Sequence, residues 1–452
     1  MQATPTIAAL RFGTGARQGE IDGMGADPIT NLKGQLQAAP EALVGMQSAV
    51  ALLAEYRRLS QAAKEAKQEG QSEGAQDAAK ERTKFIRSTY VQEAASALNV
   101  AASSDSPFLE RLSLFWANHF TVSGRGGIEA MLAGAFVREA IRPHLTGTFA
   151  ELLTAAVKHP AMLVYLNNDN SVGPNSPLGK KRKKGLNENL AREILELHTL
   201  GSNGGYTPKD VTNFARLLTG WSIARKDTDT SESGFMFRKQ THERGPIELL
   251  GNSWDDTTLK EGEVFLAQLA TSAKTARHIA TKLVAHFIAD EPPPACVAAV
   301  EAAFVKSNGD LKTCYSAMLD SAEAWEAPLS KYKTPQHFLV SALRGLGQSV
   351  DDKALVRFLS VTGQSLWQAP SPKGWPDDEK SWLSESGMNG RLQLATRLAA
   401  QLGGKRSDDI SLLAADVLGD TLSDETETAI KRAGDRKQAL TILLMSPEFQ
   451  RH

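Results

Sequence analysis

The chain has 452 residues, of which 41% are hydrophobic and 23% are charged, and its formal net charge is -1. A chain of this length can bury a large core and is expected to form two or three packing units. The near-zero net charge argues against a general binder of nucleic acid or membrane surfaces, because such proteins carry a large basic excess. With only two cysteines, Cys296 and Cys314, the chain has neither a disulfide framework nor a Cys-based zinc site.

No apolar run in the sequence reaches the ~18–20 residues that a membrane span needs. Residues 1–5 form neither a basic n-region nor an apolar h-region, so we see no signal peptide. We therefore expect a cytoplasmic protein, unless another protein carries it out of the cytoplasm.

Apolar residues recur at helical spacing over most of the chain. Residues 40–65 are predicted to form one helix. Residues 61–85 contain almost no large apolar side chain before Phe85, so we expect an exposed helix or a charged, mobile insertion there. Ser106 and Pro107 then open a clearer helix, as the capping serine and the first-turn proline.

Helical spacing also predicts most of the later elements. The further predicted helices lie at residues 128–142, 147–158, 187–200, 208–220, 258–271, 273–289, 295–306, 311–320, 335–346, 352–362, 388–402, 408–418, 424–432 and 436–445. Residues 165–186 are rich in Asn, Gly, Pro and Ser and predict a long loop. Residues 222–257 contain two short extended runs, 235–237 and 247–250, which fit a small β-hairpin around residues 233–251.

These elements predict an all-α, multi-helix array with one small β-hairpin insertion. An N-terminal helical arm is expected over residues 1–100 and a main helical domain over residues 101–350. Residues 351–452 are expected to form a C-terminal Trp/Pro-rich segment and helical region. Three tryptophans and three prolines in residues 365–384 predict that this segment is irregular but ordered.

The most informative predicted helix covers residues 187–200. On a helical wheel at about 100° per residue, Glu188, Arg192 and Glu196 lie on one polar side. Their spacing of i, i+4 and i+8 allows Arg192 to pair with either carboxylate.

Two ionisable residues of the same helix, Glu193 and His198, are directed toward its apolar side. A carboxylate and an imidazole that face a core must be hydrogen-bonded or paired. Perturbed groups of this kind are candidate site residues. The alternative is a buried structural network that fixes the helix to the adjoining loop.

Other histidines allow two interpretations each. His119 shares an apolar helix stripe, which is typical of a core histidine, although a ligand or base is the alternative. His278, Lys282 and His286 share one helix face, which predicts a solvated or anion-facing edge. His242 lies among charged residues of the predicted hairpin and is either a surface histidine or a general base.

Weaker patterns suggest binding surfaces. The basic run 180–184 lacks interleaved aromatic residues, so it indicates a solvated loop, or a contact to an anion or acidic partner, rather than a nucleic-acid site. Five tryptophans suggest a sugar-stacking platform or a clamp that fixes a loop to the body: Trp221, Trp254, Trp367, Trp375 and Trp382. No phosphate loop, nucleophile elbow or His-Glu-x-x-His motif occurs, so no metal site is predicted, and the sequence leaves the question of a cofactor open.

Short, specific motifs extend over nearly the whole chain. The central motifs are Gly185–Glu193, Glu196–Gly201, Gly204–Thr207, Asp210-Val211 and Leu218–Trp221. The outlying motifs are Arg11–Gly13, Phe115–Phe120, His159–Met162, Lys282-Leu283, His286-Phe287, Lys333–Pro335 and Gly374–Pro376. Together they resemble the signature of the bacterial family called domain of unknown function 1800.

The resemblance implies a largely helical protein without an agreed activity. Genes of this family often neighbour a gene for an alkaline-phosphatase- or sulfatase-like protein with an export signal. The resemblance therefore implies that protein as a partner, and it conflicts with a purely cytoplasmic location. The family often has His-Asp-x-Gly where this chain has His242-Glu243-Arg244-Gly245, and the longer carboxylate argues against strict metal geometry there.

Three functional hypotheses follow. The first is an accessory, scaffold or binding protein that acts with the phosphatase- or sulfatase-like partner. The second is an enzyme for a polar, sugar-like or anionic substrate, with Glu193 or Glu196 as acid/base and His198 or His242 as proton partner. The third is glycan binding by the C-terminal tryptophan-rich segment. The candidate substrate- or anion-binding residues are Arg192, Glu188, Asn118 and His119.

Overall fold

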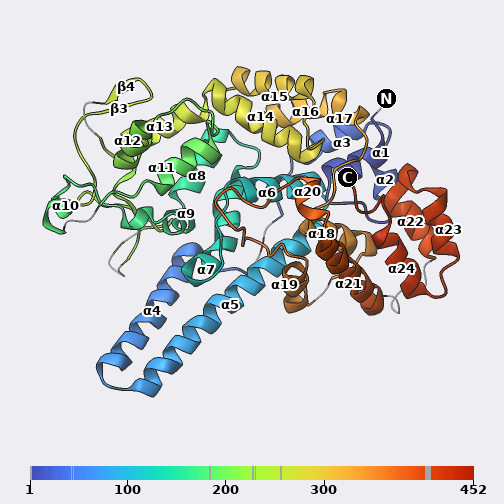
Figure 1. Cartoon of the computed structure of the whole chain (residues 1–452), viewed down its shortest axis with the longest axis horizontal. Helices are drawn as coiled ribbons and strands as arrows, with labels where there is room; N and C mark the ends of the chain where they lie inside the picture. The colour runs from blue at the N-terminus through green and yellow to red at the C-terminus, as the bar shows by residue number, and fades with distance from the viewer. Residues whose placement is uncertain are drawn as a thin grey trace.

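The computed structural model of the chain describes residues 3–41, 43, 45–182, 185–225, 229, 231–254, 257–349, 351–402 and 409–452. This part of the chain is mostly α-helical and contains two small antiparallel sheets of two strands each (Figure 1). The predicted all-α class with a small β insertion is therefore confirmed. No helix among these residues combines the length and the apolar character that a bilayer crossing requires.

The N-terminal region consists of short helices followed by a long helical hairpin. The short helices are α1 (Pro5–Ile7), η1 (Ala8–Phe12), α2 (Glu20–Gly23) and α3 (Pro28–Gln35). The hairpin is formed by α4 (Ala49–Gln68) and α5 (Ser72–Ser103) and projects from the body of the molecule (Figure 1). Its first helix begins at Ala49 rather than at residue 40, because the Ser48 side chain accepts a hydrogen bond from the amide of Ala51 and caps it. The polar residues 61–85 form the tip of this hairpin.

The larger of two hydrophobic cores draws on residues from Ala8 to Trp325. Its helices are α6 (Pro107–His119), α7 (Gly127–Phe136), η2 (Val137–Ile141), η3 (Arg142–His144), α8 (Phe149–Lys158), α9 (Pro160–Tyr165), η4 (Asn168–Asn170), α10 (Pro177–Arg182), α11 (Asn189–Glu193), η5 (Ile194–His198), α12 (Pro208–Leu218), α13 (Leu259–Ala270), α14 (Ala273–Phe287), α15 (Pro294–Lys306), α16 (Leu311–Leu319) and α17 (Glu323–Glu326). The helix predicted over residues 187–200 is α11, which continues as the π-helical turn η5.

A second hydrophobic core joins the C-terminal half of α5 to the C-terminal region. The helices of that region are α18 (Pro335–Leu346), α19 (Asp352–Val361), α20 (Glu379–Trp382), α21 (Glu385–Leu402), α22 (Ile410–Leu418), η6 (Gly419–Thr421), α23 (Asp424–Lys431) and α24 (Arg436–Met445). Residues 366–378, which we call the strap, connect α19 and α20 and return to the first core. There the carbonyl of Trp367 accepts a hydrogen bond of 2.7 Å from the amide of Gly124.

The strands form where extended runs were predicted, but their pairing differs from the prediction. β1 (Trp221–Ile223) pairs with β2 (Phe235–Phe237), and β3 (Ile247–Leu249) pairs with β4 (Asn252–Trp254). The predicted hairpin between residues 235–237 and 247–250 is therefore wrong. The physical reason is local: Leu250 and Gly251 both have positive φ, at 48° and 77°, which is the geometry of a tight two-residue hairpin turn that returns β3 onto β4.

Candidate functional site

The strap is fixed to the C-terminal end of α6. The side-chain amide of Asn118 donates a hydrogen bond of 2.9 Å to the carbonyl of Trp375 and accepts one of 2.8 Å from its amide. Gly374 adopts a positive φ of 88°, and a Cβ atom there would lie 2.6 Å from the carbonyl oxygen of Asn118. A glycine is therefore needed for the strap to approach α6 this closely.

A cavity of about 290 Å³ lies between α6, α14 and the strap. The rings of Phe115 and Trp375 line it. Its polar lining consists of Asn118 and His119 from α6, Lys282 and His286 from α14, and Lys373, Asp377 and Asp378 from the strap. Two of the predicted substrate-binding residues, Asn118 and His119, therefore line this cavity.

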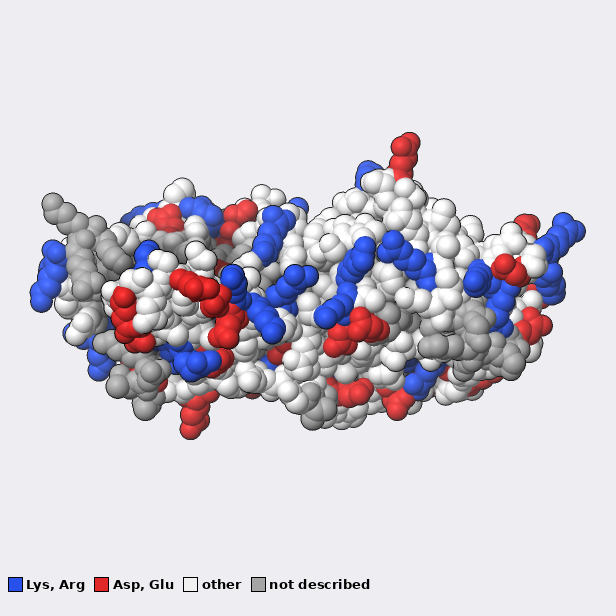
Figure 2. All heavy atoms as spheres, turned by 90° about the horizontal axis from the view of Figure 1, so that it is seen from below, with Lys and Arg blue, Asp and Glu red and all other residues white. Residues whose placement is uncertain are grey.

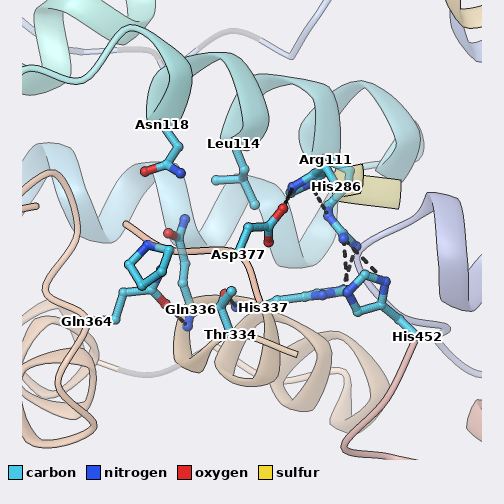
Figure 3. A pocket seen from close by; sticks show the side chains of 11 residues that line it. Arg111, Leu114, Asn118, His286, Thr334, Gln336, His337, Gln364, Asp377 and His452 are labelled. Atoms are coloured by element: carbon cyan, nitrogen blue, oxygen red, sulfur yellow. Dashed lines mark hydrogen bonds and ion pairs between the residues drawn. The ribbon is translucent and has the colours of Figure 1, made fainter. Parts of the chain in front are cut away.

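Beside this cavity, a smaller one of about 40 Å³ is bounded by a buried guanidinium among imidazoles (Figure 3). Arg111 is only 2% exposed. Its Nε donates to Nε2 of His286 at 3.0 Å, its Nη1 lies 3.1 Å from Nε2 of His337, and its Nη2 lies 3.2 Å from Nε2 of His452. A guanidinium has no acceptor, so the ring nitrogens must accept and the three imidazoles must be neutral.

Asp377 completes this arrangement on the other side of His286. Nδ1 of His286 donates to Oδ2 of Asp377 at 2.6 Å, so the ring accepts from Arg111 and donates to the carboxylate (Figure 3). Burial alone would raise the pKa of Asp377, but His286 and Lys331 outweigh burial and hold this pKa at about 2. Burial also lowers the pKa of His286, which agrees with its neutral form.

The surroundings of the two cavities contain more cations than carboxylates to neutralise them. Among the described residues, Arg111 makes no hydrogen bond to a carboxylate, whereas Lys331 pairs with Asp290 at 2.8 Å. Lys333 is 1% exposed, and its Nζ lies 4.5 Å from the ring centre of Phe449. Burial lowers the pKa of Lys333 to about 7, so this amine is only partly charged at neutral pH. On the face seen in Figure 2, acidic and basic side chains are interspersed. The cationic surplus is therefore a property of the interior at this site rather than of that face.

Lys282 is the cation that faces the larger cavity. Within the described part of the chain, no hydrogen bond or ion pair reaches its Nζ. Burial lowers the pKa of its amine to about 8, with Asp377 raising and Lys373 lowering it. An unpaired, partly desolvated amine beside a cavity is a group that an anionic or electrophilic ligand can engage.

The predicted centre on helix 187–200 lies elsewhere and does not line either cavity. Nη2 of Arg192 pairs with Oε2 of Glu188 at 3.0 Å on the surface. Glu193 and Glu196 are half-buried, and burial, followed by the charge of Glu196, raises the pKa of Glu193. Glu188, Arg192 and Glu196 thus form a polar helix face, and Glu193 lies half-buried beside it. None of these residues lines the cationic cavity.

His198 is buried at the end of the π-helical turn and contacts His119. The carbonyl of His198 accepts from Nε2 of His119 at 3.2 Å, and the carbonyl of Leu197 accepts from Nε2 of His278 at 3.0 Å. The π-helical turn thus leaves carbonyls free for two imidazoles. Neither ring nitrogen of His198 has a hydrogen-bond partner among the described residues, and burial lowers its pKa to about 3. The helix face of His278, Lys282 and His286 is half-buried, and Lys282 and His286 line the larger cavity.

His242 is buried, at 2% exposure, and the expectation of a surface histidine is wrong. Its Nδ1 lies 2.6 Å from the carbonyl oxygen of Thr219 and its Nε2 lies 2.7 Å from that of Thr257. Both ring nitrogens are therefore engaged by the backbone, and the ring lies outside the cavities. The neighbouring Glu243 accepts two hydrogen bonds of 2.7 Å from Asn175, which fixes the loop that precedes α10.

Sequence reasoning missed Arg111, Asp377 and the role of the C-terminal His452. Glu110 and Arg111 stand together in an otherwise apolar stretch of α6, and this pair of buried charges was a usable signal. The motifs Lys333–Pro335 and Gly374–Pro376 also lie directly beside the cavities. His452 belongs to no motif that would have marked it as a site residue.

Comparison with known proteins gives one informative match. A search among curated proteins and one among solved structures found no similar protein. The model of the family "Protein of unknown function (DUF1800)" matches residues 7–451, which is nearly the whole chain and includes every residue of the two cavities except His452. The chain therefore belongs to the DUF1800 family.

Proposed function

We propose that the protein binds a small anionic ligand in the cavity between α6, α14 and the strap. The observation that carries this proposal is the ammonium of Lys282 in that cavity, to which the described residues make no hydrogen bond or ion pair, beside a buried region with a cationic surplus. A buried charge without a partner is costly, and a ligand of opposite charge removes that cost. The site thus favours anions over neutral molecules of the same size.

The residues that line the cavity have two different roles: some provide charge for the ligand, and others hold the strap in place. Lys282 and Lys373 supply positive charge from opposite walls, α14 and the strap. The amide of Asn118 is already used by the backbone of Trp375, so it positions the strap rather than the ligand. The enzyme hypothesis accordingly moves from the Glu/His/Arg helix to this cavity, which His119 lines. Nδ1 of His119 has no hydrogen-bond partner among the described residues.

The direct test is calorimetric titration of the full chain with inorganic phosphate and sulfate, with glucose as the neutral probe. We expect saturable binding of an anion and none of glucose. Lys282→Met should weaken anion binding about tenfold or more, because a charge-assisted hydrogen bond contributes about 1.5–3 kcal/mol. Lys306→Met is the matched control, since this exposed lysine of α15 lies outside the cavity. Equal binding by the two variants, or none by the unmodified protein, would refute the proposal.

A second proposal is the accessory role with the phosphatase- or sulfatase-like partner. The observation that favours it is the α4–α5 hairpin, which projects from the body and has a polar tip over residues 61–85 (Figure 1). Co-purification of the two proteins from cells that express both genes tests it. Partner recovery should depend on residues 61–85, and a monomer that never retains the partner would contradict the role.

A further inference from the structure

We propose that Lys282 forms an imine with a small carbonyl-bearing anion, such as a 2-oxo acid, in the cavity between α6, α14 and the strap. This inference rests on the proposed anion-binding function and adds a covalent step at one atom, Nζ of Lys282. An amine is a nucleophile only when it is unprotonated and accessible to the carbonyl carbon. The geometry of the cavity meets the second requirement, and the burial of the amine favours the first.

The cavity fits a ligand of a few carbon atoms. Its volume of about 290 Å³ lies near the lower limit of small-molecule sites, which is roughly 300 Å³. Lys282 lines it without a hydrogen bond or ion pair from the described residues, so no protein group has to be displaced before the amine reacts. Lys373 lines the same cavity from the strap and can face the carboxylate of the ligand.

Charged and titratable groups surround Lys282 on every element that packs against it. His278 and His286 flank it on α14, His119 faces it from α6, and His198 from η5. The strap contributes Asp377, Asp378 and Lys373. Burial is the largest influence and lowers the amine pKa to about 8, so a substantial fraction of the amine is neutral near pH 7.5.

We assign the proton transfer of this step to His119, which lines the same cavity as Lys282. Its Nε2 must donate to the carbonyl of His198, so its Nδ1 carries the lone pair, and this atom has no hydrogen-bond partner in the described residues. Nζ of Lys282 attacks the carbonyl carbon to form a C–N bond, and the carbonyl oxygen takes up protons and leaves as water. Both hydrogens of the neutral amine depart with that oxygen, and His119 Nδ1 carries a proton from nitrogen to oxygen. The step needs no oxidant, reductant or cofactor.

The experiment traps the imine in the full chain. The protein is incubated with glyoxylate and cyanoborohydride at pH 8, and peptide mass mapping locates carboxymethyl groups on lysines. Lys306 in the same sample is the internal control. At pH 8, an amine of pKa about 8 is half neutral, whereas an ordinary lysine is only about 0.4% neutral. Because a less basic amine is also a weaker nucleophile, we expect Lys282 to react about tenfold faster than Lys306.

Three further readouts separate the possible results. The labelling rate of Lys282 should have its pH midpoint near 8. Phosphate should slow labelling of Lys282 but not of Lys306. His119→Gln, which keeps a donor for the His198 carbonyl, should slow labelling of Lys282 several-fold and leave Lys306 unchanged.

If Lys282 is labelled no faster than Lys306, the proposed imine is refuted. If calorimetry nevertheless detects phosphate binding, the anion-binding function stands without the imine. Fast labelling of Lys282 by glyoxylate and by uncharged glycolaldehyde alike, without protection by phosphate, would support the imine and refute the anion-binding function. Fast labelling by glyoxylate alone, with protection by phosphate, supports both.

Discussion

Replacement of His198 by leucine tests directly whether the buried ring nitrogens of this histidine destabilise the folded protein. His198 is 1% exposed, and neither of its ring nitrogens has a hydrogen-bond partner among the described residues. Two unsatisfied polar atoms in a core destabilise the folded state, and each such group costs about 1–3 kcal/mol. Leucine has a similar volume and no polar atom. We therefore expect His198→Leu to be at least as stable as the unmodified protein at pH 7, which is unusual for a core substitution.

The pH dependence gives this prediction its magnitude. The pKa of His198 is lowered by burial to about 3 in the folded protein, and an unfolded histidine has a pKa of about 6.5. The unfolded chain therefore binds a proton that the folded chain refuses, so stability is lost as the pH falls below about 6.5. Between pH 7 and pH 5, this single group should lower the free energy of unfolding by about 2 kcal/mol. His198→Leu should remove that loss.

Guanidinium chloride unfolding, followed by circular dichroism at pH 7, 6 and 5, measures both quantities. His144→Leu is a matched control, because burial lowers the pKa of this half-buried ring as well but leaves it partly solvated. It should change the pH dependence less than His198→Leu. Two results would refute the reasoning. Equal pH dependence of His198→Leu and the unmodified protein would mean that the ring is solvated, and a large loss of stability at pH 7 would mean that its nitrogens make polar contacts.

Three further predictions concern the strap. Asn118→Ala should lower the free energy of unfolding by about 1–3 kcal/mol, because two hydrogen bonds are lost. It should also make residues 366–378 more sensitive to limited proteolysis. Asn189→Ala, on the exposed start of α11, should have neither effect. Asp377→Asn should lower the free energy of unfolding by about 1–3 kcal/mol, because His286 and Lys331 lose the carboxylate they face; an unchanged denaturation curve would show that the pair is fully screened. If the tryptophan-rich segment binds glycans, Trp375→Ala should abolish polysaccharide pull-down with an unchanged circular dichroism spectrum, and retained binding would dispose of that hypothesis.

The sequence predicted helices well because their signals are local. Residues 436–445 were predicted and found as α24, where the Asp435 side chain accepts a hydrogen bond from the amide of Gln438. Residues 311–320 correspond to α16, which Asp310 caps in the same way. The predicted first residue of α4 was wrong because the helical spacing of apolar residues also occurs before the N-cap at Ser48. The strand pairing failed because it depends on a turn geometry at Leu250 and Gly251 that composition alone does not specify.

The candidate site was predicted only in part because it is assembled from distant segments. Asn118 and His119 were recognised on one helix, but Asp377 lies more than 250 residues further along the chain and meets them only through the strap. Periodicity showed that His278, Lys282 and His286 share a face, yet it carries no information on what covers that face. The charge of Lys282 therefore suggested a solvated or anion-facing edge, and the structure places a cavity beside it.

The arrangement around Arg111 links the two cores through protonation. Arg111 and His286 belong to helices of the first core, while His337 and His452 belong to the region of the second. Burial lowers the pKa of His337 and of His452 well below the ordinary value, and the charge of Arg111 lowers both further. A proton on either ring replaces an acceptor with a donor and adds a charge beside a guanidinium that cannot lose its own. Arg111 therefore attracts His337 and His452 at neutral pH and repels them once acid protonates their rings. We expect the wall that the two cavities share to open in acid before the helices of either core unfold.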